Sequence, residues 1–135
     1  MIDLQPLLSN GGWLLATIVA FGAMIFVHEL GHFLVAKRAG VVIHAFALGF
    51  GPRLFATQRG ETTYAVNLIP FGGYVRMAGE DFEPPTGEEG QPLEEEGSFR
   101  RKRVDVRMAI VAAGPVMNLL LAAVILAVIA AGFGV

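Results

Sequence analysis

The stretch that decides the fold is residues 14–32, LLATIVAFGAMIFVHELGH, an apolar run that ends in two histidines. Its first part, Leu14–Val27, contains no charged residue. The wider apolar block Gly11–Ala36 would be about 39 Å long as a helix, at ~1.5 Å per residue, and the hydrocarbon core of a bilayer is ~30 Å thick. The block therefore predicts a transmembrane helix.

The only ionisable residues in this block are His28, Glu29 and His32. Histidines four positions apart lie on one face of a helix and can bind the same zinc ion. Glu29 beside them can act as general base on a water molecule that zinc activates. Ionisable groups at membrane depth are costly without a functional partner, so the motif favours a zinc-dependent hydrolase over a chance match.

The composition supports a membrane protein with one modest domain. The chain has 135 residues, of which 54% are hydrophobic and 16% are charged. A net charge of −2 gives no reason to expect a nucleic-acid partner. Because there is no cysteine, zinc would have to use histidine and carboxylate ligands.

A second apolar block, Met108–Val135, contains no charged residue and predicts a second transmembrane helix. Gly114-Pro115 within it predicts a kink or a helix start. Its main polar group, Asn118, has two possible roles, a hydrogen bond across helices or a contact with substrate backbone at the site. The sequence ends in or just after this block, without a polar tail, which we interpret as a fragment of a longer protein.

The charge distribution predicts the topology. All ten Lys and Arg residues lie between Lys37 and Arg107, in the connection between the two apolar blocks. The positive-inside rule places this connection in the cytoplasm and both termini on the other side of the membrane. Within it, Gly79–Gly97 has eight acidic and no basic residues, which predicts a flexible linker.

The remaining part of the connection has the pattern of strands. Thr62–Val66 is β-branched and aromatic, Gln58–Glu61 predicts a turn, and Leu54–Thr57 would supply the partner strand. Such an apolar segment is expected at the membrane surface or dipping into it, where protein or a water-filled cavity must cover its backbone. The predicted fold is a mainly α membrane protein with transmembrane helices at 11–38 and 104–135, a cytoplasmic, membrane-associated β-hairpin region at 41–78 and an acidic linker at 79–99.

The third zinc ligand is harder to find, although catalytic zinc usually has three protein ligands. A metzincin would need Gly and His where Val35 and Arg38 stand, so that class is excluded. His44 is expected to be structural. Three acids are conceivable ligands but lie in polar or turn segments: Glu61, Glu80 and Asp81. We therefore expect the third ligand outside these 135 residues.

Taken together, the motifs resemble those of the site-2 protease family of intramembrane zinc metalloproteases, and most of all the bacterial regulator-of-sigma-E protease branch. The likeness rests on four motifs that follow the order of that family: His28–His32, Gly49–Pro52, Pro70–Val75 and Gly114–Asn118. It covers nearly the whole chain.

The resemblance implies that His28 and His32 ligate Zn²⁺ and that Glu29 activates the water. The hairpin region would receive an unwound substrate segment by strand addition. We expect four residues to contact the substrate: Gly72, Gly73, Tyr74 and Asn118.

The resemblance also implies a third ligand from an Asp in a Leu-Asp-Gly type motif of a later helix. These residues contain neither that motif nor the PDZ region of the family, so the C-terminal remainder of the protease would be a required partner. The implied location is the bacterial inner membrane. The implied substrates have a single transmembrane helix, such as anti-sigma factors or signal-peptide remnants.

Two alternatives stay open on the residues alone. The first is a membrane-anchored, gluzincin-like protease with a cytoplasm-facing site, in which a downstream glutamate would complete the zinc site. Mutating Glu61, Glu80 or Asp81 would then abolish zinc binding. In a non-catalytic membrane module that binds a partner through the hairpin and second span, Glu29→Gln would change nothing.

Overall fold

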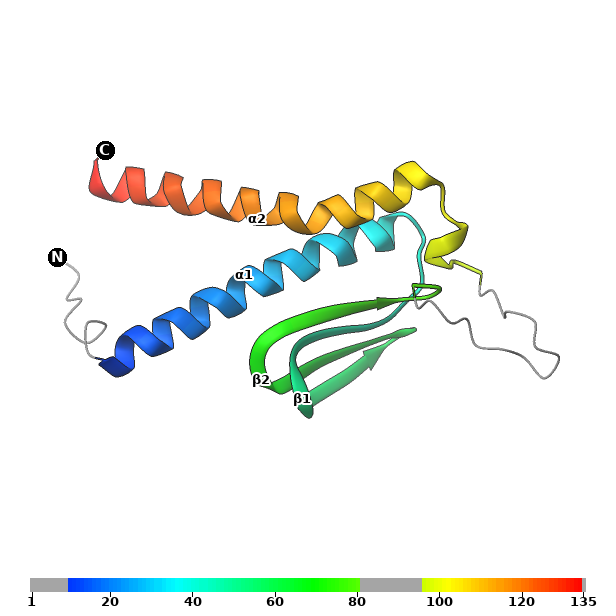
Figure 1. Ribbon diagram of the computed structural model, residues 1–135, viewed down its shortest axis with the longest axis horizontal. Coiled ribbons are helices and arrows are strands. Elements are labelled where there is room, and N and C mark those ends of the chain that lie inside the picture. Colours follow the sequence, from blue (N-terminus) through cyan, green and yellow to red (C-terminus); the bar gives the residue numbers. More distant parts are fainter. Residues whose placement is uncertain (1–9, 81–95, 135) are drawn as a thin grey trace.

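The computed structural model describes residues 10–80 and 96–134 (Figure 1). The elements, in chain order, are helix α1 (Asn10–Arg38), strand β1 (Ile43–Arg59), strand β2 (Thr62–Met77), the short 3-10 helix η1 (Phe99–Arg101) and helix α2 (Val104–Phe133). The two long helices run in opposite directions, so the start of α1 and the end of α2 lie at the same end of the molecule (Figure 1). The strands pack beside the other half of α1.

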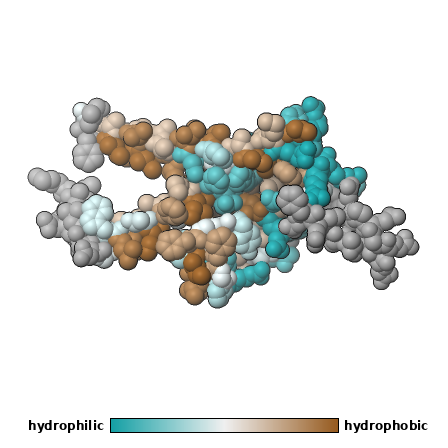
Figure 2. All heavy atoms as spheres, viewed as in Figure 1, coloured by the Kyte–Doolittle hydropathy of each residue, from teal (hydrophilic) through white to brown (hydrophobic). Residues whose placement is uncertain are grey.

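Both long helices are apolar enough to cross a membrane, over Gly11–Arg38 and Val104–Gly132. Only 6% of the apolar window of α1 and 17% of that of α2 are buried against the described part of the chain, so most of both apolar surfaces is exposed in this structure. Figure 2 shows apolar side chains over most of both helices, and hydrophilic ones gathered at the end where α2 begins. The predicted pair of apolar helices and the hairpin are thus confirmed. Most of the predicted acidic linker, 81–95, lies outside the described residues.

The helices meet through small residues. A Cβ added at Gly31 would lie 2.5 Å from the carbonyl oxygen of Ala113 and 2.8 Å from Cγ of Met117. Only glycine permits this approach, as at other close crossings of membrane helices. Pro115 lies inside α2, which begins at Val104, so the expectation that Gly114-Pro115 could start a helix is wrong.

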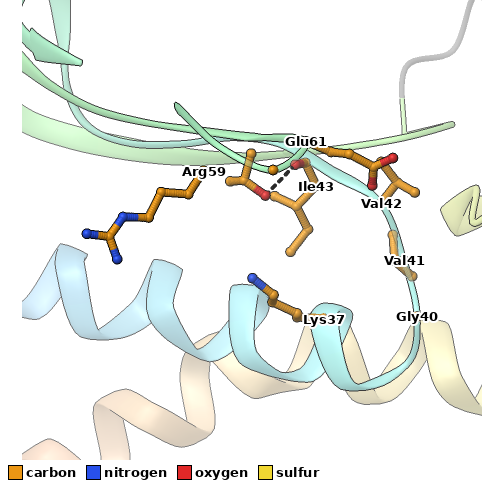
Figure 3. A pocket seen from close by; sticks show the side chains of 9 residues that line it. Lys37, Gly40, Val41, Val42, Ile43, Arg59 and Glu61 are labelled. Atoms are coloured by element: carbon orange, nitrogen blue, oxygen red, sulfur yellow. Dashed lines mark hydrogen bonds between the residues drawn. The ribbon is translucent and has the colours of Figure 1, made fainter. Parts of the chain in front are cut away.

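The strands form a two-stranded antiparallel sheet whose turn contains Gly60, with φ of +61°. The predicted pairing around this turn is confirmed, because Thr57 pairs with Tyr64 and Phe55 with Val66. The hydroxyl of Thr62 donates a hydrogen bond of 2.8 Å to the carbonyl of Ile43, drawn as a dashed line in Figure 3. This bond brings the turn of the hairpin back to the start of β1, beside the end of α1.

The hairpin is bent, which the sequence did not predict. Residues 45–48 of β1 pair with both ends of β2, so that Ala47 is opposite Tyr74 on one side and Ala65 on the other. At the bend, Gly72 has φ of +111°, and a Cβ there would collide with the ring of Phe50. The bend leaves large apolar side chains about half exposed or more: Phe50, Leu54, Phe55, Leu68, Ile69 and Phe71.

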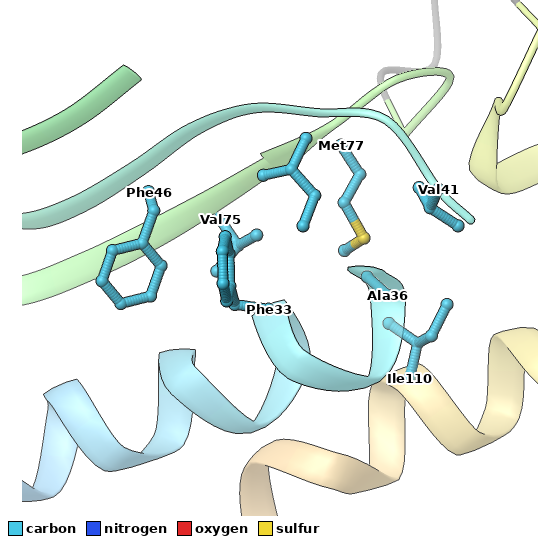
Figure 4. Close-up of a cluster of buried hydrophobic side chains, with 8 residues drawn as sticks. Phe33, Ala36, Val41, Phe46, Val75, Met77 and Ile110 are labelled. Atoms are coloured by element: carbon cyan, nitrogen blue, oxygen red, sulfur yellow. The ribbon is translucent and has the colours of Figure 1, made fainter. Parts of the chain in front are cut away.

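A small core joins the elements at one end of the helices (Figure 4). It combines side chains of α1, the loop after α1, both strands and α2: Phe33, Ala36, Val41, Ile43, Phe46, Val75, Met77 and Ile110. The rings of Phe33 and Phe46 pack edge to face with centroids 5.1 Å apart. Phe33 follows His32 directly, and Ile110 is fully buried, so this core fixes the residues that surround the histidines.

Candidate metal centre and substrate groove

The two histidines face one space between the helices. His28 and His32 lie one turn apart on α1, with ring centroids 4.9 Å apart. Gly114 of α2 stands opposite them, and a Cβ added there would lie 2.7 Å from Nε2 of His28 and collide with Nε2 of His32. Both Nε2 atoms therefore converge on a space that exists because residue 114 has no side chain.

The other ring nitrogen of His32 is held by the backbone of α2. Its Nδ1 lies 2.7 Å from the carbonyl oxygen of Ile110. A carbonyl can only accept a hydrogen bond, so Nδ1 carries the proton and donates it. The Nε2 lone pair is then available toward Gly114, which is the tautomer that a metal ligand needs.

Asn118 of α2 holds His28 in a similar way. Nδ2 of Asn118 lies 3.1 Å from Nδ1 of His28, while Oδ1 of Asn118 is buried and has no hydrogen-bond partner among the described residues. A half-turn of the amide places Oδ1 on Nδ1–H of His28, which satisfies the orphaned oxygen and frees Nε2 for a metal. The amide nitrogen then occupies the buried position where the oxygen was.

These residues fit two positions of a zinc site. Metal-bound histidines usually donate their second N–H to a carbonyl or another acceptor, and both acceptors here come from α2. Within 10–80 and 96–134, no group of three or more His, Cys, Asp and Glu side chains is placed to hold a metal together. His44 lies in β1, Glu61 at the hairpin turn and Glu80 after β2, and none of them forms such a group with the histidine pair. Asp81 lies outside the described residues.

Glu29 lies at the meeting point of two cavities. It contacts Gly73 of β2 so closely that a Cβ there would lie 3.1 Å from its Cγ. One cavity, of about 350 Å³, is lined by Met24, Ile25, His28, Glu29, Gly72, Gly73 and Asn118. The other, of about 370 Å³, is lined by Glu29, His32, Gly73, Tyr74, Val75, Met77, Glu80, Phe99, Ile110 and Val111. We call the two together the groove.

The structure thus brings the expected site residues together. Gly72, Gly73, Tyr74 and Asn118 all line the groove that passes Glu29 and the histidines. For Asn118 the structure shows the hydrogen bond across helices, and its second expected role, a contact with substrate, stays a prediction, as do the substrate contacts of the other three.

Two parts of the site were missed from the sequence. The sequence indicates Gly114 as a point where the helix bends or begins and as part of a family motif, but not as the residue that faces both histidines. The carbonyl of Ile110 has no sequence signal at all, because every residue has one.

Two histidines directed at one space, beside a glutamate on the same helix, are the arrangement of a zinc-dependent peptidase. Comparison with protein families agrees, since the model of peptidase family M50 matches residues 16–135. The chain belongs to peptidase family M50, which confirms the predicted membership of the site-2 proteases.

Similar curated proteins come from several bacteria. The zinc metalloprotease RasP of Geobacillus kaustophilus is 53% identical over 78 residues, which are 58% of this chain and 18% of RasP. The regulator of sigma-W protease RasP of Bacillus subtilis is 54% identical over 67 residues, 50% of this chain and 16% of that protein. A putative zinc metalloprotease of Clostridium acetobutylicum is 39% identical over 118 residues, 87% of this chain and 32% of that protein. The chain therefore spans a third or less of the length of each of these relatives.

Proposed function

We propose that the chain is the N-terminal part of an intramembrane zinc endopeptidase that cleaves within or near transmembrane segments of its substrates. The observation that carries the proposal is the convergence of Nε2 of His28 and His32 on the space in front of Gly114. Further support comes from Glu29, which lies in the groove beside them. The relatives named as zinc metalloproteases support zinc as the metal.

The proposed location is the bacterial inner membrane, with the N-terminus periplasmic and residues 37–107 cytoplasmic. Basic residues support this orientation, because Lys37 and Arg38 end α1 and a basic run, 100–103, precedes α2. The opposite ends of both helices lie together at the other end of the molecule (Figure 1). The exposed apolar side chains at the bend of the hairpin would enter the bilayer, since contiguous apolar patches mark partner or membrane contacts.

In this proposal, each residue of the site has a separate role in peptide hydrolysis. Zinc, when bound, supplies a Lewis acid that lowers the pKa of water and polarises a peptide carbonyl. His28 and His32 would hold it through Nε2. Glu29 takes the proton of the attacking water and passes it to the leaving amine nitrogen. Asn118 keeps His28 in the binding tautomer and offers an N–H to the substrate backbone.

The last part of β2 would align the substrate. Residues 73–77 pair with 43–48 of β1 along one edge, and the groove follows them past Glu29. An extended peptide can add to the other edge through main-chain hydrogen bonds, which also exposes the carbonyls that a helix hides. We propose the same substrates as the resemblance implies, single-span membrane proteins such as anti-sigma factors or signal-peptide remnants.

The third ligand is proposed to come from the remaining C-terminal part of the protease. The histidine pair fills two positions, and no third carboxylate or histidine joins it in the described part of the chain. The relatives are three or more times longer than the matched segment, which leaves ample sequence for such a ligand.

The test is zinc content and cleavage of a single-span substrate in proteoliposomes, for the full-length protease and its Glu29→Gln variant. We expect the variant to keep zinc and lose cleavage. Cleavage at the unaltered rate by Glu29→Gln would contradict the role of Glu29. The gluzincin alternative is tested by the zinc content of Glu61→Gln, Glu80→Gln and Asp81→Asn, all of which should retain the metal.

A further inference from the structure

We propose that the end of the groove next to β2 and η1 is a subsite for a lysine or arginine side chain of the substrate, and that Glu80 is the carboxylate that recognises it. This inference rests on the proposed function, because it concerns the peptide that lies in the same groove. It adds a specificity-determining residue outside the proposed metal ligands and general base.

Glu80 stands at the far end of the 370 Å³ cavity. Gly73, which contacts Glu29, begins the part of β2 that lines this cavity, and Met77 ends it. Four steps of strand at ~3.3 Å each separate them by about 13 Å. The backbone N–H of Met77 donates to Oε2 of Glu80 over 3.2 Å, which fixes the carboxylate at that end.

The segment that carries Glu80 is anchored. Ala78 donates its N–H to the carbonyl of Val42 over 2.9 Å and accepts a hydrogen bond of 2.7 Å from the N–H of Phe99. Gly79 has φ of +70° and fits against the hydroxyl of Ser98, where a side chain would collide. Glu80 therefore has a defined position, and its carboxylate has lone pairs left after the bond to Met77.

The lining of this cavity matches a basic side chain. Among the described residues, its carboxylates are those of Glu29 and Glu80, its other titratable side chains are His32 and Tyr74, and no lysine or arginine lines it. The wall between the two glutamates is mostly aliphatic and aromatic: Tyr74, Val75, Met77, Phe99, Ile110 and Val111. Lysine and arginine have an apolar stem and a cationic head, so they can cover such a wall and reach a carboxylate at its end.

The two cavities of the groove differ in polarity, as a membrane substrate does between its apolar span and its charged flank. The 350 Å³ cavity offers Met24, Ile25 and glycine backbone around the catalytic side chains, which suits an apolar residue. The 370 Å³ cavity ends in Glu80, near the basic residues proposed to be cytoplasmic. Membrane proteins carry lysine and arginine on that side of their spans. Pairing with Glu80 would thus set which peptide bond of the span comes to lie at Glu29.

The test exchanges charge on both sides of the pair. Full-length protease in proteoliposomes is given three single-span substrates that differ at one flanking position, as Lys, Gln or Glu. We expect Glu80→Gln to lower kcat/KM for the Lys substrate by about two- to fivefold, the range of a partly solvated ion pair, and to leave the Gln substrate unchanged. Glu80→Lys should reverse the preference in favour of the Glu substrate.

The matched control is Glu61→Lys. Glu61 is an exposed acid, as Glu80 is, but it lies at the hairpin turn and lines a separate cavity with Lys37 and Arg59 (Figure 3). The same charge change there should therefore leave the substrate preference unaltered. Equal effects of both Glu80 variants on all three substrates would overturn the subsite. Loss of zinc in Glu80→Gln would overturn it too, because Glu80 would then be a metal ligand.

A binding measurement separates this inference from the proposed function. Crosslinking of the three substrates to the Glu29→Gln protease reports their preference without hydrolysis. A preference for Lys that disappears in the Glu29→Gln, Glu80→Gln double variant supports the subsite even if the wild-type protein cleaves nothing. Cleavage without any such preference would support the proposed peptidase function and refute the subsite. If Glu80→Lys does not fold, the isosteric Glu80→Gln and the substrate series still decide.

Discussion

The two helices contribute opposite kinds of chemistry to one site. Helix α1 supplies the reactive side chains, His28, Glu29 and His32. Helix α2 leaves space for them at Gly114, which has no side chain, and contributes the backbone carbonyl of Ile110 and the side-chain amide of Asn118. The difference teaches that the helix that carries the metal ligands can be recognised from its sequence, whereas the helix that orients those ligands has almost no sequence signal.

The sharpest way to test the α1 side of this comparison is Glu29→Gln. The amide keeps the shape but cannot take a proton, so kcat of the full-length protease should fall by about 10²- to 10⁴-fold, the usual contribution of a general base. Zinc content should stay unchanged. Loss of both would mean that Glu29 supports the metal and does not act as a base.

The corresponding change on α2 is Gly114→Ala. Its methyl group would enter the space shared by both Nε2 atoms, so zinc affinity should fall by more than the roughly 10- to 100-fold that follows loss of an outer hydrogen bond. Isothermal titration of the detergent-solubilised protease measures it. Gly132→Ala in the same helix is the control, because nothing lies within 4 Å of its added Cβ. Equal affinities for the two variants would show that the histidines do not bind metal at Gly114.

A smaller effect is expected at Asn118. Asn118→Leu removes the partner of His28 Nδ1 and should weaken zinc binding by about 10- to 100-fold. Asn118→Asp keeps an acceptor and should restore most of the affinity, although it cannot donate to a peptide and should still raise KM. If Leu and Asp weaken zinc binding equally, Asn118 does not orient His28.

The smallest effect concerns the contact between the helices. Gly31→Ala pushes a methyl group against Ala113 and should destabilise the helix pair by roughly 1–3 kcal/mol, the range for overpacking. Thermal unfolding followed by circular dichroism in detergent reports it. Gly22→Ala, also in α1 but with nothing within 4 Å, should be nearly neutral. Equal unfolding temperatures for the two variants would mean that the close contact at Gly31 is not needed.

Much of the fold could be predicted because its signals are local. An apolar block predicts each helix, and a turn followed by a β-branched and aromatic run predicts the pairing of Thr57 with Tyr64. The second pairing of residues 45–48 could not be predicted, because it depends on the bend at Gly72 and Phe50 that folds the hairpin onto itself. In the site, the four-residue spacing of His28 and His32 predicts a metal-binding pair. The role of the Ile110 carbonyl depends on how α2 packs against α1, which the sequence does not indicate.

The close approach at Gly31 has a thermodynamic consequence. The histidines belong to α1 and their hydrogen-bond partners to α2, so a bound metal and the docked helix pair stabilise each other by linkage. Such coupling is reciprocal: whatever factor helix docking adds to metal affinity, the metal adds to docking. Gly31 lies between the two histidines. A single methyl group there should therefore weaken both metal binding and the docking of the two helices.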